Sequence, residues 1–341
     1  MSSFVRKAGA CPGVAIACLA CAAGLATAEP QGFDLQGHRG ARGLHPESSL
    51  EGFREALAIG VTTLEMDVGT TKDGVVVVHH DEQLHPEIAR GPDGQWLAPP
   101  TPALVDISWE ELQSHDVGHL QPGSAYAERF PDQQGRHGVR VPRFSAVLAD
   151  AEQQSGRRIH YNVETKLSPD APERSIGPAK LADALLRELR EAGVEKRSTV
   201  QSFDWRSLRH VQKTAPELPT ACLTSEDEDE DTLQRGKPGA SPWTAGLDLD
   251  DFDGSVPRLV KAAGCDIWSP DFPHLDAEAL AESHELGLKV LPWTVNEPAD
   301  IEAVLALGVD GVISDRPDRV RKAMAARGMP LPRAYPVPPS K

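Results

Sequence analysis

The sequence of 341 residues has few aromatic residues, few cysteines and no concentration of basic residues. Aromatic residues make up 5% of it, cysteines number five, and the formal net charge is −16. This acidic balance argues against nucleic acid or an anionic membrane as a partner, because neutralising phosphates requires a basic surface. A small phosphate ester is still compatible with it, since a metal ion or a few cations can bind one locally. No apolar run suits a stable membrane span, which needs roughly 20 residues.

The first 28 residues have the pattern of a secretory signal peptide. Arg6 and Lys7 precede a short apolar stretch at 13–25, and 26–28 reads Ala-Thr-Ala, a small-x-small cleavage site. A buried N-terminal helix is the alternative, which Pro12 and the many small residues disfavour. We therefore expect an exported protein, periplasmic or secreted.

Three of the five cysteines lie in that leader, and removing it leaves Cys222 and Cys265. In an oxidising compartment an even pair can form one disulfide. Two separate buried thiols fit the same spacing equally well.

Strand-like and helix-like segments alternate along the rest of the chain. Strands are expected at 33–38, 62–68, 74–80, 158–165, 198–202, 219–224, 265–271, 288–295 and 309–315. Helices are expected at 48–59, 144–155, 177–192, 204–214, 276–286, 298–306 and 317–326. Eight of these strands, counted without 74–80, alternate with helices, which predicts an α/β fold, a (β/α)₈ TIM barrel forming a single domain over 29–326. A doubly wound sheet shares the alternation, but no glycine-rich dinucleotide fingerprint follows the first strand.

Three segments depart from this rhythm. Residues 82 to about 140 are rich in Pro, Gly, Asp and Gln, which predicts a long insertion with little regular structure, and such loops are often functional. The acidic run at 225–231 is interpreted as a solvated surface loop. The proline-rich segment 327–341 is expected to form a loose tail.

Polar residues stand at the carboxyl ends of the predicted strands, where parallel barrels carry their catalytic groups. Polar residues with only structural roles would not recur at the carboxyl end of strand after strand. The sequence therefore predicts a site at this rim, formed by His38, Arg39, Glu65, Asp67, His80, Asp81, Glu164, Lys166, Trp293, Asn296 and Asp315.

Three carboxylates, Glu65, Asp67 and Glu164, are expected to lie together on adjacent strand ends. Without compensation they would repel one another, and at least one would stay protonated. A hard divalent cation resolves the repulsion, and oxygen-only ligation favours Ca²⁺ or Mg²⁺ over zinc.

Two histidines, His38 and His80, flank the same predicted rim. Such a pair can act as general base and general acid near neutral pH. Arg39 and Lys166 are cations suited to stabilising charge on a phosphate. Strand alternation sends His79 to the opposite face, and we interpret it as structural or surface, together with His45, His85, His115 and His119.

At this point the motifs resemble those of the glycerophosphodiester phosphodiesterase family. The shared features are H-R-G, P-E-x-(S/T), E-x-D and D-G-x-x-V-x-x-H-D, all between residues 38 and 81. Further along follow E-T-K at 164–166, Q-S-F at 201–203, P-W-T-V-N at 292–296 and G-V-D-G-V-I-S-D-x-P at 308–317. Together they cover nearly all of the expected mature chain in the right order.

The resemblance implies a metal-dependent hydrolase of glycerophosphodiesters on a TIM barrel. It implies that Glu65, Asp67 and Glu164 hold the metal, that His38 and His80 are the acid and base, and that Arg39 and Lys166 contact the phosphate. Phe203 and Trp293 would line the glycerol or leaving-group side, with rim packing as their alternative role. Glu47 would lie near the site, as a metal ligand or a neighbour of one. The partner implied is a small glycerophosphodiester, with products glycerol 3-phosphate and an alcohol such as choline or ethanolamine.

Two departures from the family pattern bear on specificity. Ser48 stands where the family usually has Asn, and a short Arg-Thr-Thr run that commonly follows His80-Asp81 is replaced by the start of the insertion. Two rival functions stay open beside the first, a related barrel phosphodiesterase or lipase acting on intact lipids, and a non-catalytic protein that binds glycerophosphodiesters. Nothing in the pattern specifies an oligomeric state.

Overall fold

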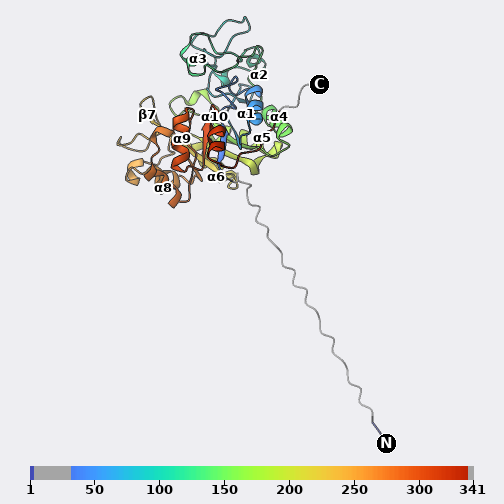
Figure 1. The fold of residues 1–341 in the computed structure, drawn as a ribbon, viewed down its shortest axis with the longest axis vertical. Coiled ribbons are helices and arrows are strands. Elements are labelled where there is room, and N and C mark those ends of the chain that lie inside the picture. The colour runs from blue at the N-terminus through green and yellow to red at the C-terminus, as the bar shows by residue number, and fades with distance from the viewer. Residues whose placement is uncertain (4–31, 337–341) are drawn as a thin grey trace.

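The computed structural model describes residues 1–3 and 32–336, and within them it is a nearly closed barrel of parallel strands surrounded by helices (Figure 1). The predicted signal peptide falls mostly on residues 4–31, outside the described residues. The eight barrel strands are β1 (Asp34–Gly37), β2 (Thr63–Thr70), β4 (His160–Thr165), β5 (Ser198–Ser202), β6 (Thr220–Thr224), β9 (Ile267–Pro270), β10 (Lys289–Val290) and β11 (Gly311–Ser314).

The sheet runs in the order β10-β9-β6-β5-β4-β2-β1-β11, which follows the chain around the barrel. Backbone hydrogen bonds cross the remaining seam, from Asp310 N to Val290 O at 3.1 Å and from Ile313 N to Pro292 O at 3.0 Å. The predicted TIM barrel is therefore confirmed, and the carboxyl ends of its strands share one rim.

Helices cover the outside of the barrel, and their caps explain where they begin and end. In α1, Ser49 accepts a hydrogen bond from Gly52 N at 3.0 Å, and Gly60 ends the helix in a left-handed conformation. The helices longer than five residues are α1 (Leu50–Ile59), α4 (Phe144–Ser155), α5 (Pro178–Ala192), α6 (Trp205–Thr214), α7 (Val256–Ala262), α8 (Ala277–Glu285), α9 (Pro298–Leu307) and α10 (Pro317–Ala326).

The predicted strand at 74–80 is not a barrel strand. It is β3 (Val76–Val78), which pairs antiparallel with β2 and begins the insertion. Its irregular course contains η1 (Leu104–Asp106), α2 (Trp109–Leu112) and α3 (Ala125–Arg129), which Figure 1 shows together beyond the barrel. The insertion buries a small apolar core of its own, formed by Val77, Leu84, Ala89, Leu104, Leu112, Val117, Val139 and Val141.

Short helices and one hairpin lie in the connections between the barrel strands and helices. They are η2 (Pro172–Arg174), η3 (Glu195–Arg197), η4 (Leu249–Phe252), η5 (Phe272–His274) and the two-stranded hairpin of β7 (Glu226–Asp227) and β8 (Glu230–Asp231). The hairpin is formed by the acidic run interpreted as a solvated loop. In the segment predicted as a loose tail, Tyr335 N donates to Leu57 O at 2.7 Å, which fixes that part against α1.

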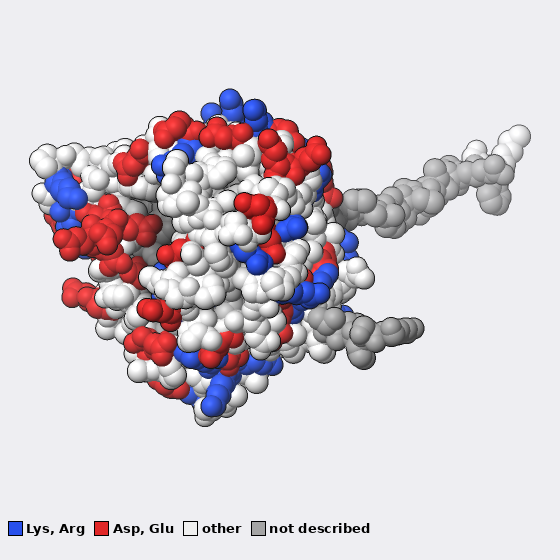
Figure 2. All heavy atoms as spheres, turned by 90° about the horizontal axis from the view of Figure 1, so that it is seen from above, with Lys and Arg blue, Asp and Glu red and all other residues white. Residues whose placement is uncertain are grey.

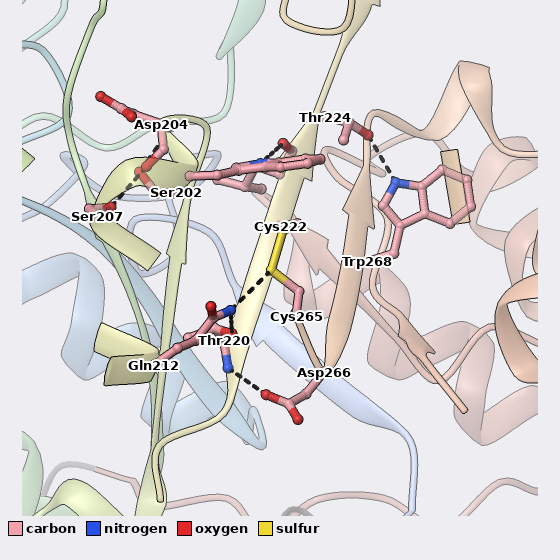
Figure 3. Close-up of a disulfide and its surroundings, with 12 residues drawn as sticks. Ser202, Asp204, Ser207, Gln212, Thr220, Cys222, Thr224, Cys265, Asp266 and Trp268 are labelled. Carbon is pink, nitrogen blue, oxygen red and sulfur yellow. Dashed lines mark hydrogen bonds between the residues drawn. A yellow bond between two sulfur atoms is a disulfide. The ribbon is translucent and has the colours of Figure 1, made fainter. Parts of the chain in front are cut away.

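A disulfide joins Cys222 in β6 to Cys265, just before β9 (Figure 3). The sequence left this pairing and two free thiols open, and the structure has the disulfide. Nearby, Trp268 Nε1 donates to Thr224 Oγ1 at 2.9 Å, so the two strands are also joined through side chains. Among the described residues, no helix is long and apolar enough to cross a membrane.

Candidate active site

A cavity of about 350 Å³ opens at the carboxyl rim of the barrel strands. The barrel supplies one part of its wall and the insertion supplies another. From the barrel come His38, Arg39, Arg42, Glu65, Glu164, Gln201, Phe203, Leu223, Trp293, Thr294 and Ile313, from the β7–β8 hairpin Glu230, and from β3 onward His80, Asp81, His85, Tyr126 and Arg129.

The turn after β1 brings two of the predicted site residues to the rim. His38 N donates to Ser314 O on β11 at 2.9 Å, which continues the strand ladder by one residue. Gly40 follows with a φ of 90°, and a Cβ there would lie 2.6 Å from the carbonyl carbon of Gly52 in α1. Glycine is therefore required for the turn to pack against the start of the helix.

The three predicted metal carboxylates converge as expected. One ligand oxygen from each of Glu65, Asp67 and Glu164 lies within 4.8 Å of the others, and all three residues are buried. Glu65 is held by Arg39 N at 2.8 Å and by Gln201 Nε2 at 2.9 Å. Gln201 is part of a polar layer inside the barrel, because its Oε1 accepts from Asn162 Nδ2 at 2.8 Å.

Asp67 is the member of this cluster that most clearly lacks a partner. Both of its carboxylate oxygens are buried without a hydrogen bond. The nearest cationic atoms are Arg39 Nε at 3.7 Å and Lys166 Nζ at 3.9 Å, both beyond hydrogen-bonding distance. A buried carboxylate in this position costs free energy unless a cation binds it. The oxygen-only donor set therefore fits a hard divalent ion.

The pKa values of two of these carboxylates reflect the repulsion that a bound cation would relieve. Burial and the neighbouring Asp67 raise the pKa of Glu65 well above its usual range. Burial and Asp67 also raise the pKa of Glu164 to about 8, although Lys166 Nζ lies 2.8 Å from its Oε1. A bound cation would restore the ionised form of both carboxylates.

His38 is oriented by a buried network from the last two strands. Its Nδ1 lies 2.7 Å from Asp315 Oδ1, and its Nε2 faces the cluster, 4.0 Å from Glu65 Oε2. Asp315 is itself fixed by Arg42 Nε at 2.7 Å and by Asn296 Nδ2 at 2.7 Å. Burial would raise the pKa of Asp315, but Arg42 and His38 hold it well below its usual range. Asp315 is therefore an acceptor that keeps the proton of His38 on Nδ1 and frees Nε2 for the cavity.

His80 repeats this arrangement at the start of the insertion. Its Nδ1 lies 2.6 Å from Asp81 Oδ1, and its Nε2 lies 3.1 Å from Lys166 Nζ. Burial, Arg39 and Lys166 lower the pKa of His80 well below its usual range, and burial and Arg42 lower that of His38 to about 4. With these lowered pKa values, both imidazoles are neutral at neutral pH and can accept a proton.

Glu47 joins the barrel rim to the insertion. Arg39 Nη1 donates to its Oε1 at 3.0 Å, and the Tyr126 hydroxyl donates to its Oε2. Arg42 Nη1 donates to the same hydroxyl at 3.3 Å. Glu47 therefore lies beside the site as predicted. It is hydrogen-bonded to Arg39 and Tyr126 and is not a member of the carboxylate cluster.

Phe203 and Trp293 meet edge to face in the cavity wall, with ring centroids 5.3 Å apart at 89°. Trp293 Nε1 donates to Ser269 O at 2.9 Å, which fixes the indole. Both residues line the cavity as the resemblance implied, and they also pack against each other, so the two alternatives for them are compatible.

The predicted site residues gather at this rim, and several further ones join them. Arg42 and Gln201 were missed, although Gln201 stands in the quoted Q-S-F motif. Asp315 and Asn296 were placed at the rim without a role. His85, interpreted as structural or surface, lines the cavity, as does Tyr126. No periodicity marks these two, since the insertion that carries them has little regular structure.

A family model described as the glycerophosphoryl diester phosphodiesterase family matches residues 38–319. Among curated proteins, a glycerophosphodiester phosphodiesterase of Caldanaerobacter subterraneus is 28% identical over 82% of this chain and 93% of its own. One of Bacillus subtilis is 28% identical over 84% of each chain.

Solved structures have the same barrel. A crystal structure of a putative glycerophosphoryl diester phosphodiesterase from Silicibacter pomeroyi is 35% identical, covers 88% of this chain and 96% of its own, and has a TM-score of 0.78. A phosphodiesterase of Oleispira antarctica, solved in complex with the product sn-glycerol-3-phosphate, is 18% identical over 86% of this chain and 97% of its own, with a TM-score of 0.62.

Proposed function

Because the chain belongs to the glycerophosphoryl diester phosphodiesterase family, we propose that it hydrolyses glycerophosphodiesters to glycerol 3-phosphate and an alcohol, with a divalent cation, Ca²⁺ or Mg²⁺. The observation that carries this proposal is the carboxylate cluster with the unbonded oxygens of Asp67 between two carboxylate-oriented histidines. Glycerophosphocholine and glycerophosphoethanolamine are the first substrates to test.

The residues that would hold the metal are Glu65, Asp67 and Glu164, whose oxygens converge in the cavity wall. The bound cation would supply positive charge against the charge that develops on the phosphoryl oxygens. Arg39, whose Nε is buried without a hydrogen bond, supplies a second positive charge beside the cluster. Lys166 adds a third from the His80 side, 3.1 Å from that imidazole.

The two histidines carry the proton transfers. One takes the proton of the glycerol 2-hydroxyl through Nε2, and the hydroxyl oxygen forms a bond to phosphorus. The bond from phosphorus to the departing oxygen breaks, and the other histidine protonates that oxygen to give the free alcohol. Water then opens the resulting cyclic phosphate while the histidines exchange roles. Asp315 and Asp81 hold the Nδ1 protons, which keeps both Nε2 atoms turned to the substrate.

The decisive assay measures release of glycerol 3-phosphate from glycerophosphocholine by residues 29–341. The protein is assayed as prepared, after EDTA, and after Ca²⁺ or Mg²⁺ is restored. We expect release that EDTA abolishes and a divalent cation restores. No release from any glycerophosphodiester with any of these metals would reject the proposal, and release from intact phospholipids alone would assign the lipid-cleaving function instead.

We also propose that the protein is exported, to the periplasm or the medium. The signal-like segment and the Cys222–Cys265 disulfide support this, because disulfides persist in oxidising compartments. Fractionation of cells that express the full chain tests it. We expect the protein outside the cytoplasm with Glu29 as its first residue, and a full-length cytoplasmic protein would contradict the proposal.

A further inference from the structure

The acidic hairpin β7–β8 reaches the mouth of the active site through one residue. Glu230 is exposed and lines the cavity, whereas its neighbours on the hairpin do not. Figure 2 shows acidic side chains gathered at the left edge of the molecule, the side on which Figure 1 places β7. The run first interpreted as a solvated loop therefore contributes a carboxylate to the site.

The hairpin is held in place by its own polar contacts. Glu226 is bound by Arg235 at 2.6 and 2.8 Å, and Asp231 is bound by Lys237 Nζ at 2.9 Å. The base of the hairpin is closed by Thr232 N donating to Ser225 O at 2.9 Å. In register, Glu230 is opposite Asp227 on the partner strand. The position of Glu230 is thus set by paired neighbours.

Glu230 itself has no cationic partner in the structure. Among the ion pairs of residues 32–336, none includes it, although both ends of the hairpin are paired. It is therefore available to a charged group of a ligand.

The cavity that this carboxylate lines also has an aromatic part of its wall. Phe203 and Trp293 line the same cavity, and the hydrogen bond from Trp293 Nε1 to Ser269 O fixes the indole. Fixed aromatic rings with a nearby carboxylate are the chemistry that recognises ammonium and quaternary ammonium groups. The insertion side of the mouth, with Arg129, would repel such a group and leaves the hairpin side for it.

We propose that Glu230 is a specificity-determining residue that selects substrates with a cationic leaving-group alcohol, bound between this carboxylate and the aromatic wall. The proposal rests on the proposed glycerophosphodiesterase activity, and it adds the charge class of the head group. Substrates with quaternary or primary ammonium alcohols should be preferred over neutral ones of the same shape.

The test compares glycerophosphocholine with its uncharged isostere, in which 3,3-dimethylbutanol replaces choline. Both are assayed at one fixed divalent-cation concentration, and the readout is the ratio of the two kcat/KM values. We expect a ratio of about five or more in the unaltered protein, as the attraction of a partly solvated charge pair and ring predicts. Glu230→Gln should reduce it about threefold, Glu230→Lys should reduce it further, and added salt should weaken the preference.

The matched control is Glu228→Gln, which removes the same charge from the same hairpin at a residue that does not line the cavity. An equal change of the ratio in this control would overturn the assignment to Glu230. So would a Glu230→Gln ratio equal to that of the unaltered protein, or a loss shared equally by both substrates. Failure of the unaltered protein to cleave either diester would instead reject the proposed function itself, so the two failures are distinguishable.

Discussion

The site contains two histidine–carboxylate pairs of nearly the same geometry in two very different settings. His38 and Asp315, at 2.7 Å, belong to barrel strand ends, and their side chains are 10% and 2% exposed. His80 and Asp81, at 2.6 Å, stand where the insertion begins, and their side chains are 28% and 31% exposed. The first pair is fixed by further buried partners, and the second is partly exposed to solvent. The barrel pair is therefore buried and held by further contacts, whereas the pair at the start of the insertion is partly accessible to solvent.

The largest effect should come from the barrel pair itself. His38→Ala should lower kcat/KM by about a thousandfold, since general acid–base groups contribute roughly 10²–10⁴. The thermal midpoint should change little, because Arg42 and Asn296 still bind Asp315. His210→Ala, on the outer helix α6, is the matched control and should keep full activity. Activity of His38→Ala within tenfold of the unaltered protein would remove His38 from the chemistry.

The carboxylate cluster can be tested by its stability as well as its activity. Asp67→Asn should abolish activity and also the rise in thermal midpoint that Ca²⁺ or Mg²⁺ produces. At a hundredfold excess over Kd that rise corresponds to about 2.7 kcal/mol, or on the order of 5 °C for a protein of this size. Asp251→Asn, at an exposed position, should keep it. A full metal-induced shift in Asp67→Asn would place the ion elsewhere.

These two tests concern residues whose place in the site could be predicted from the sequence. Glu65 and Asp67, or Glu164 and Lys166, stand two apart at strand ends, and strand alternation puts each pair on one face. Barrel topology then brings the strand ends together. Strand alternation does not predict which partner each of these side chains binds. Arg42 follows β1 in a turn, and its bond to Asp315 joins residues 273 positions apart. Tyr126, His85 and Glu230 lie in segments without a long regular element, where only the packed structure shows which side chains reach the cavity.

Replacing the carboxylate partner of each histidine tests the comparison directly. Asp315→Asn should lower kcat/KM about a hundredfold and destabilise the protein by about 3 kcal/mol, because it leaves Arg42 buried with an unpaired charge. Asp81→Asn should cost about tenfold in kcat/KM and less than about 1 kcal/mol, since water solvates what is left. Rates on glycerophosphocholine and urea unfolding measure both. Equal losses of stability would show that burial does not distinguish the pairs.

The smallest expected effect belongs to the contact that joins the two regions. Tyr126→Phe removes the hydroxyl that donates to Glu47 and accepts from Arg42, but it keeps the ring that packs 4.8 Å from His85 and 5.2 Å from Phe130. Arg39 still donates to Glu47 at 3.0 Å, so the carboxylate keeps a hydrogen-bond partner. We expect kcat/KM to fall about fivefold to tenfold, the value of one typical hydrogen bond.

Tyr335→Phe provides the matched control for that substitution, because Tyr335 lies against α1, where its backbone N bonds Leu57 O. A fall in kcat/KM for Tyr126→Phe alone, with the unfolding midpoint of both variants unchanged, would mean that the insertion orders Glu47 and the arginines beside the substrate. Activity equal to that of the control would mean that the Tyr126 hydroxyl does not order Glu47 and the arginines. In that case the insertion would act on the chemistry through other residues, the His80–Asp81 pair among them.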